Sequence, residues 1–248
     1  MKVNFTSFGL ARSDDSFGIR SWDETVLAVL ADGAGAARGA REASSRIVES
    51  LLSYYEVRPQ SWSPPRALLE FTRLINGSLH QESMARYESP EMVSTLAAAV
   101  IEGNRLFGLN VGDSRVYLLR QGNFSQLSTD HTVNERGFRH VLKRAMGLAD
   151  VVEPDAFETE LCDGDLLFLC SDGVSNVLGD DSLASKLSHR SAARAIVQHA
   201  REHATNDNLD DMSAIVIEII ETGKLKVAAE LPLTIPETLK KGDVIDGY

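Results

Sequence analysis

The chain has 248 residues, with 25 Lys or Arg against 36 Asp or Glu, and its formal net charge is −11. That acidic balance argues against a nucleic-acid backbone or an anionic membrane surface as the main partner, and a hydrophobic content of 43% argues against disorder. The longest apolar runs, LAAAVI and LLFLC, are too short to span a bilayer. Because the first fifteen residues also lack the apolar core of a secretion signal, we expect a cytoplasmic globular protein.

Strand-like and helical patterns fill the first 220 residues. Runs rich in Val, Ile, Leu and Phe, bounded by Gly, Asp and Asn, predict strands at 3–9, 25–32, 94–103, 105–113, 115–122, 164–172 and 212–220. Apolar residues at helical spacing predict helices at 40–55, 66–87, 180–188 and 191–204. An early strand, two helices, a long meander and further helices are typical of an α+β fold and not of a βαβ alternation.

The end of the chain differs in composition. After Ile220 the sequence contains two prolines and has no clear periodicity. We therefore divide the chain into a domain over 1–220 and a linker or terminal arm over 221–248.

The cysteines and histidines give weak signals. Cys162 and Cys170 are too few for a disulfide framework and lie among apolar residues, so we expect two buried free thiols in a reducing compartment. Neither opens a glycine-rich loop ending in arginine, as a cysteine-based phosphatase would require. The histidines form no HxH or HExxH pattern, and we expect surface or structural roles for His80, His131, His140, His189, His199 and His203.

Aspartates recur where apolar strands begin or end. Asp32 and Asp172 each end an apolar run and precede a glycine, Asp113 ends a third run, and the pair Asp210–Asp211 precedes the last one. Aspartate at a strand end is often only a turn former. Several together at the edge of a core would repel one another unless a hard divalent cation such as Mg²⁺ or Mn²⁺ bound them. The set as a whole favours metal binding.

The ordered motifs resemble the metal-dependent protein Ser/Thr phosphatases (the PPM family, also called type 2C) of bacterial type. The matching segments are ARSDDSF, VLAVLADGAG, GLNVGDSRVYLLRQG, LSTDHT, KRAMG, LFLCSDGVSNVL and LDDMSAIVI. They occur in the family's order over about residues 1–220. The resemblance implies a four-layer α-β-β-α sandwich, with a central antiparallel β-sandwich and a metal centre at one end.

The resemblance also implies a role for each matching residue. Asp32 would bridge two Mn²⁺ or Mg²⁺ ions, and Asp172 would serve with it in catalysis. Arg12 would bind the substrate phosphate, and Asp14 and Asp211 would be neighbours of the ligands with doubtful direct roles. The implied metal ligands, which include a third and weaker ion at Asp113, are Asp15, Asp32, Gly33, Asp113, Asp172 and Asp210.

Several positions depart from the family pattern. Ala36 replaces a glycine, and Arg12 lies nearer to the acidic pair Asp14–Asp15 than the family's arginine does. Asp211 replaces an asparagine. The segment between DHT and KRAMG, which is the family's flap beside the active site, is short. The end TLKKGDVIDGY resembles the lead-in to bacterial Ser/Thr kinase domains, so one hypothesis is the phosphatase half of a phosphatase–kinase fusion, and the alternative is a plain terminus.

The function implied is hydrolysis of phosphoserine and phosphothreonine in proteins by direct attack of metal-bound water. Phosphorylated proteins would be the substrates, and a bacterial-type Ser/Thr kinase would be the signalling partner. The alternative is a non-catalytic phosphatase-like domain that binds phosphoproteins or regulates a kinase. A metal-dependent hydrolase of another phosphoester is a third reading, because such a metal centre is indifferent to the leaving group.

Overall fold

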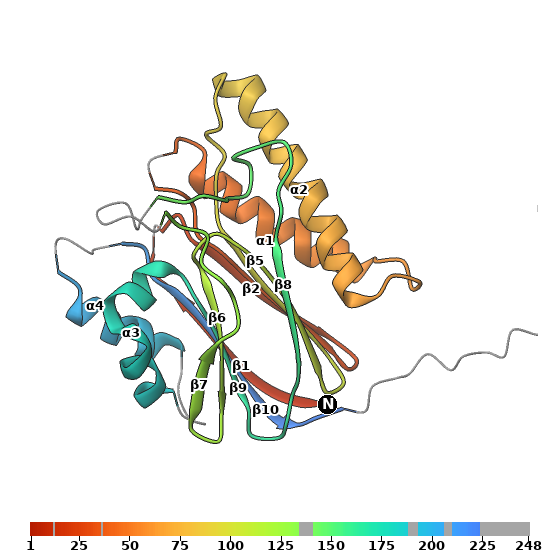
Figure 1. The fold of residues 1–248 in the computed structure, drawn as a ribbon, viewed down its shortest axis with the longest axis vertical. Coiled ribbons are helices and arrows are strands. Elements are labelled where there is room, and N and C mark those ends of the chain that lie inside the picture. Colours follow the sequence, from red (N-terminus) through yellow and green to blue (C-terminus); the bar gives the residue numbers. More distant parts are fainter. Residues whose placement is uncertain (12, 36, 134–140, 188–192, 206–209, 224–248) are drawn as a thin grey trace, which may run out of the picture.

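The computed structural model describes residues 1–11, 13–35, 37–133, 141–187, 193–205 and 210–223. Two antiparallel five-stranded sheets lie face to face, with two helices outside each, and Figure 1 shows the pairs α1/α2 and α3/α4 on opposite sides. The first sheet has the order β1 (Lys2–Gly9), β10 (Ser213–Glu221), β9 (Leu166–Cys170), β6 (Arg115–Arg120) and β7 (Asn123–Gln126). The second has the order β2 (Ser16–Trp22), β3 (Thr25–Ala31), β4 (Leu96–Glu102), β5 (Arg105–Val111) and β8 (Asp155–Glu160). This is the predicted α+β, four-layer arrangement.

The central strands are apolar on both faces because both faces are covered. In β3, Leu27 and Val29 pack toward the helices while Ala28 and Leu30 pack between the sheets. Since successive side chains of a strand point to opposite faces, a continuous apolar run is what a doubly covered strand requires.

The helices cover the outer faces with their apolar sides. Helices α1 (Ala40–Glu56) and α2 (Pro64–Tyr87) pack on the second sheet, and α3 (Asp172–Lys186) and α4 (Ala193–His203) pack on the first. Pro64 and Pro65 open α2, where the missing proline N–H groups have no helical partner to lose. None of the helices in the described ranges is long and apolar enough to cross a membrane.

Three local features differ from the sequence prediction. Strands β2 and β8 were not predicted, because each lies at an edge of its sheet and lacks the continuous apolar run of the central strands. Helix α3 begins at Asp172, eight residues before the predicted start at 180, with Ser171 at the N-cap. Cys170 is buried as expected, but Cys162 is exposed because it lies in the turn that precedes β9.

Candidate metal centre

The strand pairing brings the predicted acidic residues to one end of the sandwich. Asp15 directly precedes β2, whose Ser16 pairs with Ala31 of β3, so Asp15 lies next to Asp32. In the other sheet, the N–H of Ser171 donates to the carbonyl of Ser213 (3.1 Å), which places Asp172 beside the segment that enters β10. The loop between β1 and β2 connects the two sheets at this end.

Asp15 and Asp32 form the buried centre of this group. Loss of hydration raises the pKa of Asp15 to about 6, although hydroxyl groups, including that of Ser171 at 2.9 Å, stabilise its charged form. Loss of hydration and the charges of Asp15 and Asp172 raise the pKa of Asp32 well above its usual value. The Oδ1 atom of Asp15 is buried and has no hydrogen-bond partner among the described residues. A buried carboxylate oxygen without a partner is costly, and a bound cation would remove that cost.

Asp113 and Asp172 form a second acidic contact at the same end. Burial, followed by the charge of Asp172, raises the pKa of Asp113 to about 7. Asp172 is the first residue of α3, where the N-terminal end of the helix dipole favours a negative charge. The side-chain amide of Asn176, one turn along, donates to its Oδ2 at 3.1 Å.

Asp14 and Asp211 are both engaged in contacts within the protein. The backbone N–H of Asp14 donates to Oδ2 of Asp211 at 2.6 Å, which ties the β1–β2 loop to the segment before β10. The carboxylate of Asp14 lies 3.2 Å from Nε of Arg41. Asp210 is exposed, and its Oδ1 accepts the N–H of Asp211 at 2.8 Å. The ligand role of Asp210 and the doubtful direct roles of Asp14 and Asp211 stay predictions.

Two glycines allow the segments to approach closely. A Cβ on Gly33 would lie 2.8 Å from the carbonyl oxygens of Ala40 and Asp14. A Cβ on Gly173 would lie 2.1 Å from the carbonyl oxygen of Asp211. Because these neighbours are backbone atoms, a larger residue could fit only if the acidic segments moved apart.

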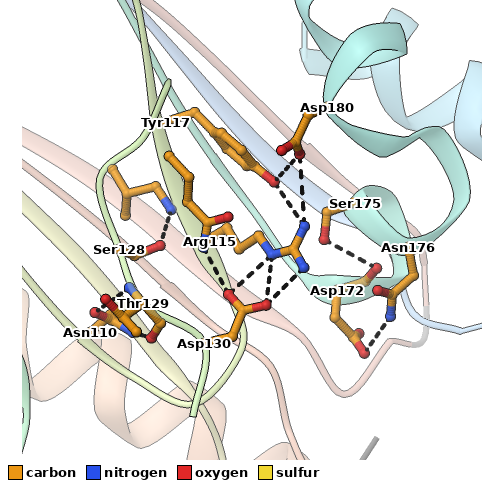
Figure 2. Close-up of polar contacts among 12 residues, drawn as sticks. Asn110, Arg115, Tyr117, Ser128, Thr129, Asp130, Asp172, Ser175, Asn176 and Asp180 are labelled. Atoms are coloured by element: carbon orange, nitrogen blue, oxygen red, sulfur yellow. Dashed lines mark hydrogen bonds and ion pairs between the residues drawn. The ribbon is translucent and has the colours of Figure 1, made fainter. Parts of the chain in front are cut away.

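An arginine–aspartate pair that sequence reasoning did not single out borders the centre. Arg115 donates from Nε and Nη2 to the carboxylate of Asp130, with the shortest contact at 2.7 Å, and from Nη1 to the hydroxyl of Tyr117 at 3.0 Å. That hydroxyl donates in turn to Asp180 of α3. Figure 2 shows Arg115 between Asp130 and the first turns of α3, where Asp172 and Asn176 lie. The pair thus connects the loop after β7, through Tyr117, to Asp180 of α3, the helix whose first residue is Asp172. Arg115 and Asp130 fall within the quoted motifs GDSR and TDHT, but neither motif shows that they pair.

Arg41 is a second residue that the sequence did not mark. It lies in the first turn of α1, and its Nε donates to the carbonyl of Ser13 at 3.1 Å as well as contacting Asp14. More than half of its side chain is exposed. It therefore places an exposed positive charge at the rim of the acidic group.

His131 has a structural environment within the protein. It is buried, and its Nδ1 accepts the N–H of Gly112 at 3.2 Å while Nε2 faces Asp155. The predicted phosphate ligand Arg12, the departure at Ala36 and most of the short flap (134–140) lie outside the described residues, as does the tail from 224.

The residues present fit a hard divalent cation. The side chains gathered here offer carboxylate oxygens, which Mg²⁺ and Mn²⁺ prefer, and Asp15 Oδ1 is a buried oxygen that needs a partner. Among the described residues, neither Asp15 nor Asp32 forms an ion pair with Lys or Arg. The acidic end therefore has the composition of a metal centre.

Comparison with known proteins supports the same conclusion. A serine/threonine phosphatase (stp) of Listeria welshimeri is 28% identical over 227 residues, covering 79% of this chain and 87% of the relative. The solved structure of PppA, a regulatory component of the type VI secretion system (T6SS) in Pseudomonas aeruginosa, superimposes with a TM-score of 0.75 at 27% identity, covering 88% of this chain and 98% of PppA. The catalytic domain of the phosphatase PstP, solved with two manganese ions, shares the fold at a TM-score of 0.73 and 22% identity, over 88% of this chain and 99% of that domain. The family model described as protein phosphatase 2C matches residues 9–212. The chain belongs to the protein phosphatase 2C family.

Proposed function

We propose that this chain is a Mn²⁺- or Mg²⁺-dependent protein serine/threonine phosphatase. The observation that carries the proposal is the unpartnered, buried Oδ1 of Asp15 beside Asp32, at the end of the sandwich where Asp172 and Asp210 also converge. A group of converging carboxylates is suited to hold divalent cations, and such cations can bind the oxygens of a phosphate ester. Membership of the phosphatase family supports the same activity.

We assign the following roles to the residues of the site. Asp32, at the centre of the group, would contact two ions, with Gly33 allowing the backbone to come close. Asp113 and Asp172 would hold a third, weaker ion. The proposed ligands are Asp15, Asp32, Gly33, Asp113, Asp172 and Asp210. When bound, the ions neutralise charge on the phosphoryl oxygens and make the attacking water more acidic.

Arg41 is suited to orient the substrate. Its guanidinium is held at Nε by Ser13 and Asp14, and guanidinium groups bind phosphate through parallel charge-assisted hydrogen bonds. Arg41→Ala should raise KM for an aryl phosphate by about tenfold with a smaller change in kcat. Arg38→Ala is the matched control, because Arg38 pairs with Glu91 and lies over the ring of Tyr87. Equal KM values for the two variants would assign phosphate binding elsewhere, with Arg12 as the next residue to test.

The activity test uses p-nitrophenyl phosphate and a phosphothreonine peptide. Wild-type protein should hydrolyse both with Mn²⁺ and neither with excess chelator, and Asp172→Asn with Mn²⁺ should be inactive while keeping the wild-type circular dichroism spectrum. A folded, Mn²⁺-loaded wild type that hydrolyses neither substrate would contradict the proposal and favour the non-catalytic phosphoprotein-binding alternative. Hydrolysis of the aryl phosphate alone would favour a different phosphoester.

The partner we propose is a Ser/Thr kinase, because phosphoserine and phosphothreonine in proteins are kinase products. The resemblance of the end of the chain to a kinase lead-in motivates a fused partner. Intact mass or a gene sequence that extends past Tyr248 into a kinase domain would support the fusion, and a natural stop codon there would remove it.

A further inference from the structure

Helix α4 carries a group of metal-ligating side chains that includes none of the predicted site residues. His199, Glu202 and His203 follow one another at positions i, i+3 and i+4, which lie on the same face of a helix. One ligand atom from each lies within 4.8 Å of the others. The neighbouring face of α4 packs against the first sheet through Ala193, Ile196, Val197 and Ala200. The group therefore stands on a helix whose position is fixed by the core.

The ring of His203 is already oriented for metal binding. Its Nδ1 lies 2.8 Å from the carbonyl oxygen of His199, which can only accept, so Nδ1 carries the proton and Nε2 keeps its lone pair. Metal-bound histidines commonly donate their second ring nitrogen in this way, and the contact fixes both tautomer and orientation. The centroids of the two imidazole rings are 4.1 Å apart.

His199 lies among charged groups from α3 and α4. Loss of hydration, and then the charges of Lys186 and His203, lower its pKa, while the carboxylate of Glu202 opposes them. His199 and Glu202 also line a hollow of about 290 Å³, with Lys186 of α3 across from them. Glu202 brings a negative charge to the hollow, where Lys186 brings a positive one.

We propose that His199, Glu202 and His203 bind one Zn²⁺ ion. Two imidazole nitrogens and one carboxylate form a borderline-soft set that suits Zn²⁺, whereas the oxygen ligands near Asp32 suit Mg²⁺ and Mn²⁺. The two sites therefore select different metals. This assignment departs from the expectation that all six histidines are surface or structural residues, because the HxxEH spacing matches neither pattern considered for the sequence.

The site has a structural consequence for the carboxylate end. Asp210 follows His203 by seven residues, and α4 packs on β1 and β10, the strands that flank the centre. A Zn²⁺ ion chelated across the last turn of α4 stabilises that turn, at the point where the chain leaves the helix toward Asp210. The inference does not depend on catalysis, since the α4 site would bind Zn²⁺ in an inactive protein as well.

The test uses the full chain saturated with Mg²⁺, so that the carboxylate centre is occupied before Zn²⁺ is added. Histidine side-chain ¹⁵N NMR then reports imidazole binding, which an all-oxygen site cannot produce. One equivalent of Zn²⁺ should shift the side-chain ¹⁵N signals of two histidines and give one event in isothermal titration calorimetry. His203→Ala should abolish both signatures, and Glu202→Gln should weaken binding by about tenfold.

Gln198→Ala is the matched control, because Gln198 lines the same hollow but provides no imidazole or carboxylate ligand. It should bind Zn²⁺ as the wild type does. His203→Ala should keep its fold and its Mn²⁺-dependent hydrolysis of an aryl phosphate. Zn²⁺ that shifts no histidine signal, or that binds His203→Ala with wild-type affinity, would overturn the proposal. Failure of the phosphatase assay in every variant would instead count only against the proposed activity.

Discussion

Strand β9 has an aspartate just beyond each end, and the two aspartates have opposite surroundings. Asp165, before the strand, is 1% exposed, and its carboxylate accepts two hydrogen bonds from Arg120, at 2.9 and 2.7 Å, and one from the N–H of Cys162 at 2.8 Å. Asp172, after the strand, lies near Asp32 and Asp113, and its charge raises the pKa of both. Before β9, Arg120 supplies a positive charge to the buried Asp165. After β9, further aspartates lie near Asp172. The comparison shows that a strand-end aspartate is structural or metal-binding according to which charges the tertiary fold places around it.

The largest expected difference between the two ends of β9 is in the effect of substitutions on kcat. Asp172→Asn should lower Mn²⁺-dependent kcat for p-nitrophenyl phosphate by at least about a thousandfold, because a neutral amide cannot replace a charged ligand. Asp165→Asn should stay within about threefold of wild type per folded molecule, since distant sites act independently. Initial rates normalised to folded protein check this, and comparable losses in both variants would refute the distinction.

For the free energy of unfolding, we expect the larger effect at the Asp165 end of β9. Arg120→Met leaves the buried carboxylate of Asp165 without its cation, and we expect a loss of about 2–3 kcal/mol in the free energy of unfolding, measured by urea denaturation. Adding Asp165→Asn should restore part of that loss. Arg105→Met is the control, because its ion pair with Glu158 is exposed and should contribute less than about 1 kcal/mol. Similar losses for Arg120→Met and Arg105→Met would argue that burial of the pair is unimportant.

Backbone packing at the acidic end should also be sensitive to size. Gly173→Ala places a methyl group 2.1 Å from the carbonyl oxygen of Asp211, so we expect a loss of about 1–3 kcal/mol in stability together with weaker Mn²⁺ binding. Gly77→Ala, in α2 with open space around the added carbon, should instead stabilise by about 0.5–1 kcal/mol. Thermal unfolding and Mn²⁺ titration of the two variants test this difference. Wild-type Mn²⁺ affinity in Gly173→Ala would contradict the prediction.

The smallest expected effect is a change of a few degrees in the Tm of the metal-free protein when one aspartate is replaced. Asp32→Asn removes one of several repelling buried carboxylates, so it should raise Tm in excess chelator, whereas Asp165→Asn should lower it. Mn²⁺ should raise the Tm of the wild type by binding the native state, and this rise should shrink in Asp32→Asn. Differential scanning fluorimetry of the three proteins, with Mn²⁺ and with chelator, gives these Tm values. A lower Tm for metal-free Asp32→Asn would show that the carboxylate is compensated.

The sequence predicted the acidic residues better than it predicted their partners. Asp32, Asp172 and Asp210 were marked because each adjoins an apolar run, and that signal is local. The pairing of Ser16 with Ala31, which brings Asp15 to Asp32, depends on β2, an edge strand with no clear apolar pattern. Sequence reasoning reached this convergence only through the family resemblance.

Pairs formed between separate segments could not be read from the chain. Arg120 and Asp165 are 45 residues apart, and Arg115 and Asp130 are 15 apart, with no periodicity connecting them. The start of α3 was missed because Gly179, inside it, has a non-helical conformation (φ 65°) that interrupts the pattern before the predicted helix. A single sequence therefore carries least information about ion pairs between distant segments and about helices that contain a kink.

The pairing of β1 with β10 has a consequence for synthesis on the ribosome. The two strands match along their whole length, from Lys2 opposite Glu221 to Gly9 opposite Ser213, and β10 lies between β1 and β9. A nascent chain that has not yet released β10 cannot complete this sheet, and contacts so distant in sequence form slowly. Asp15 and Asp32 are therefore translated early but meet Asp210 only when nearly the whole domain has emerged. A translation product that stops before Asp210 would lack one of the proposed ligands and, on the proposed mechanism, would have no hydrolytic activity.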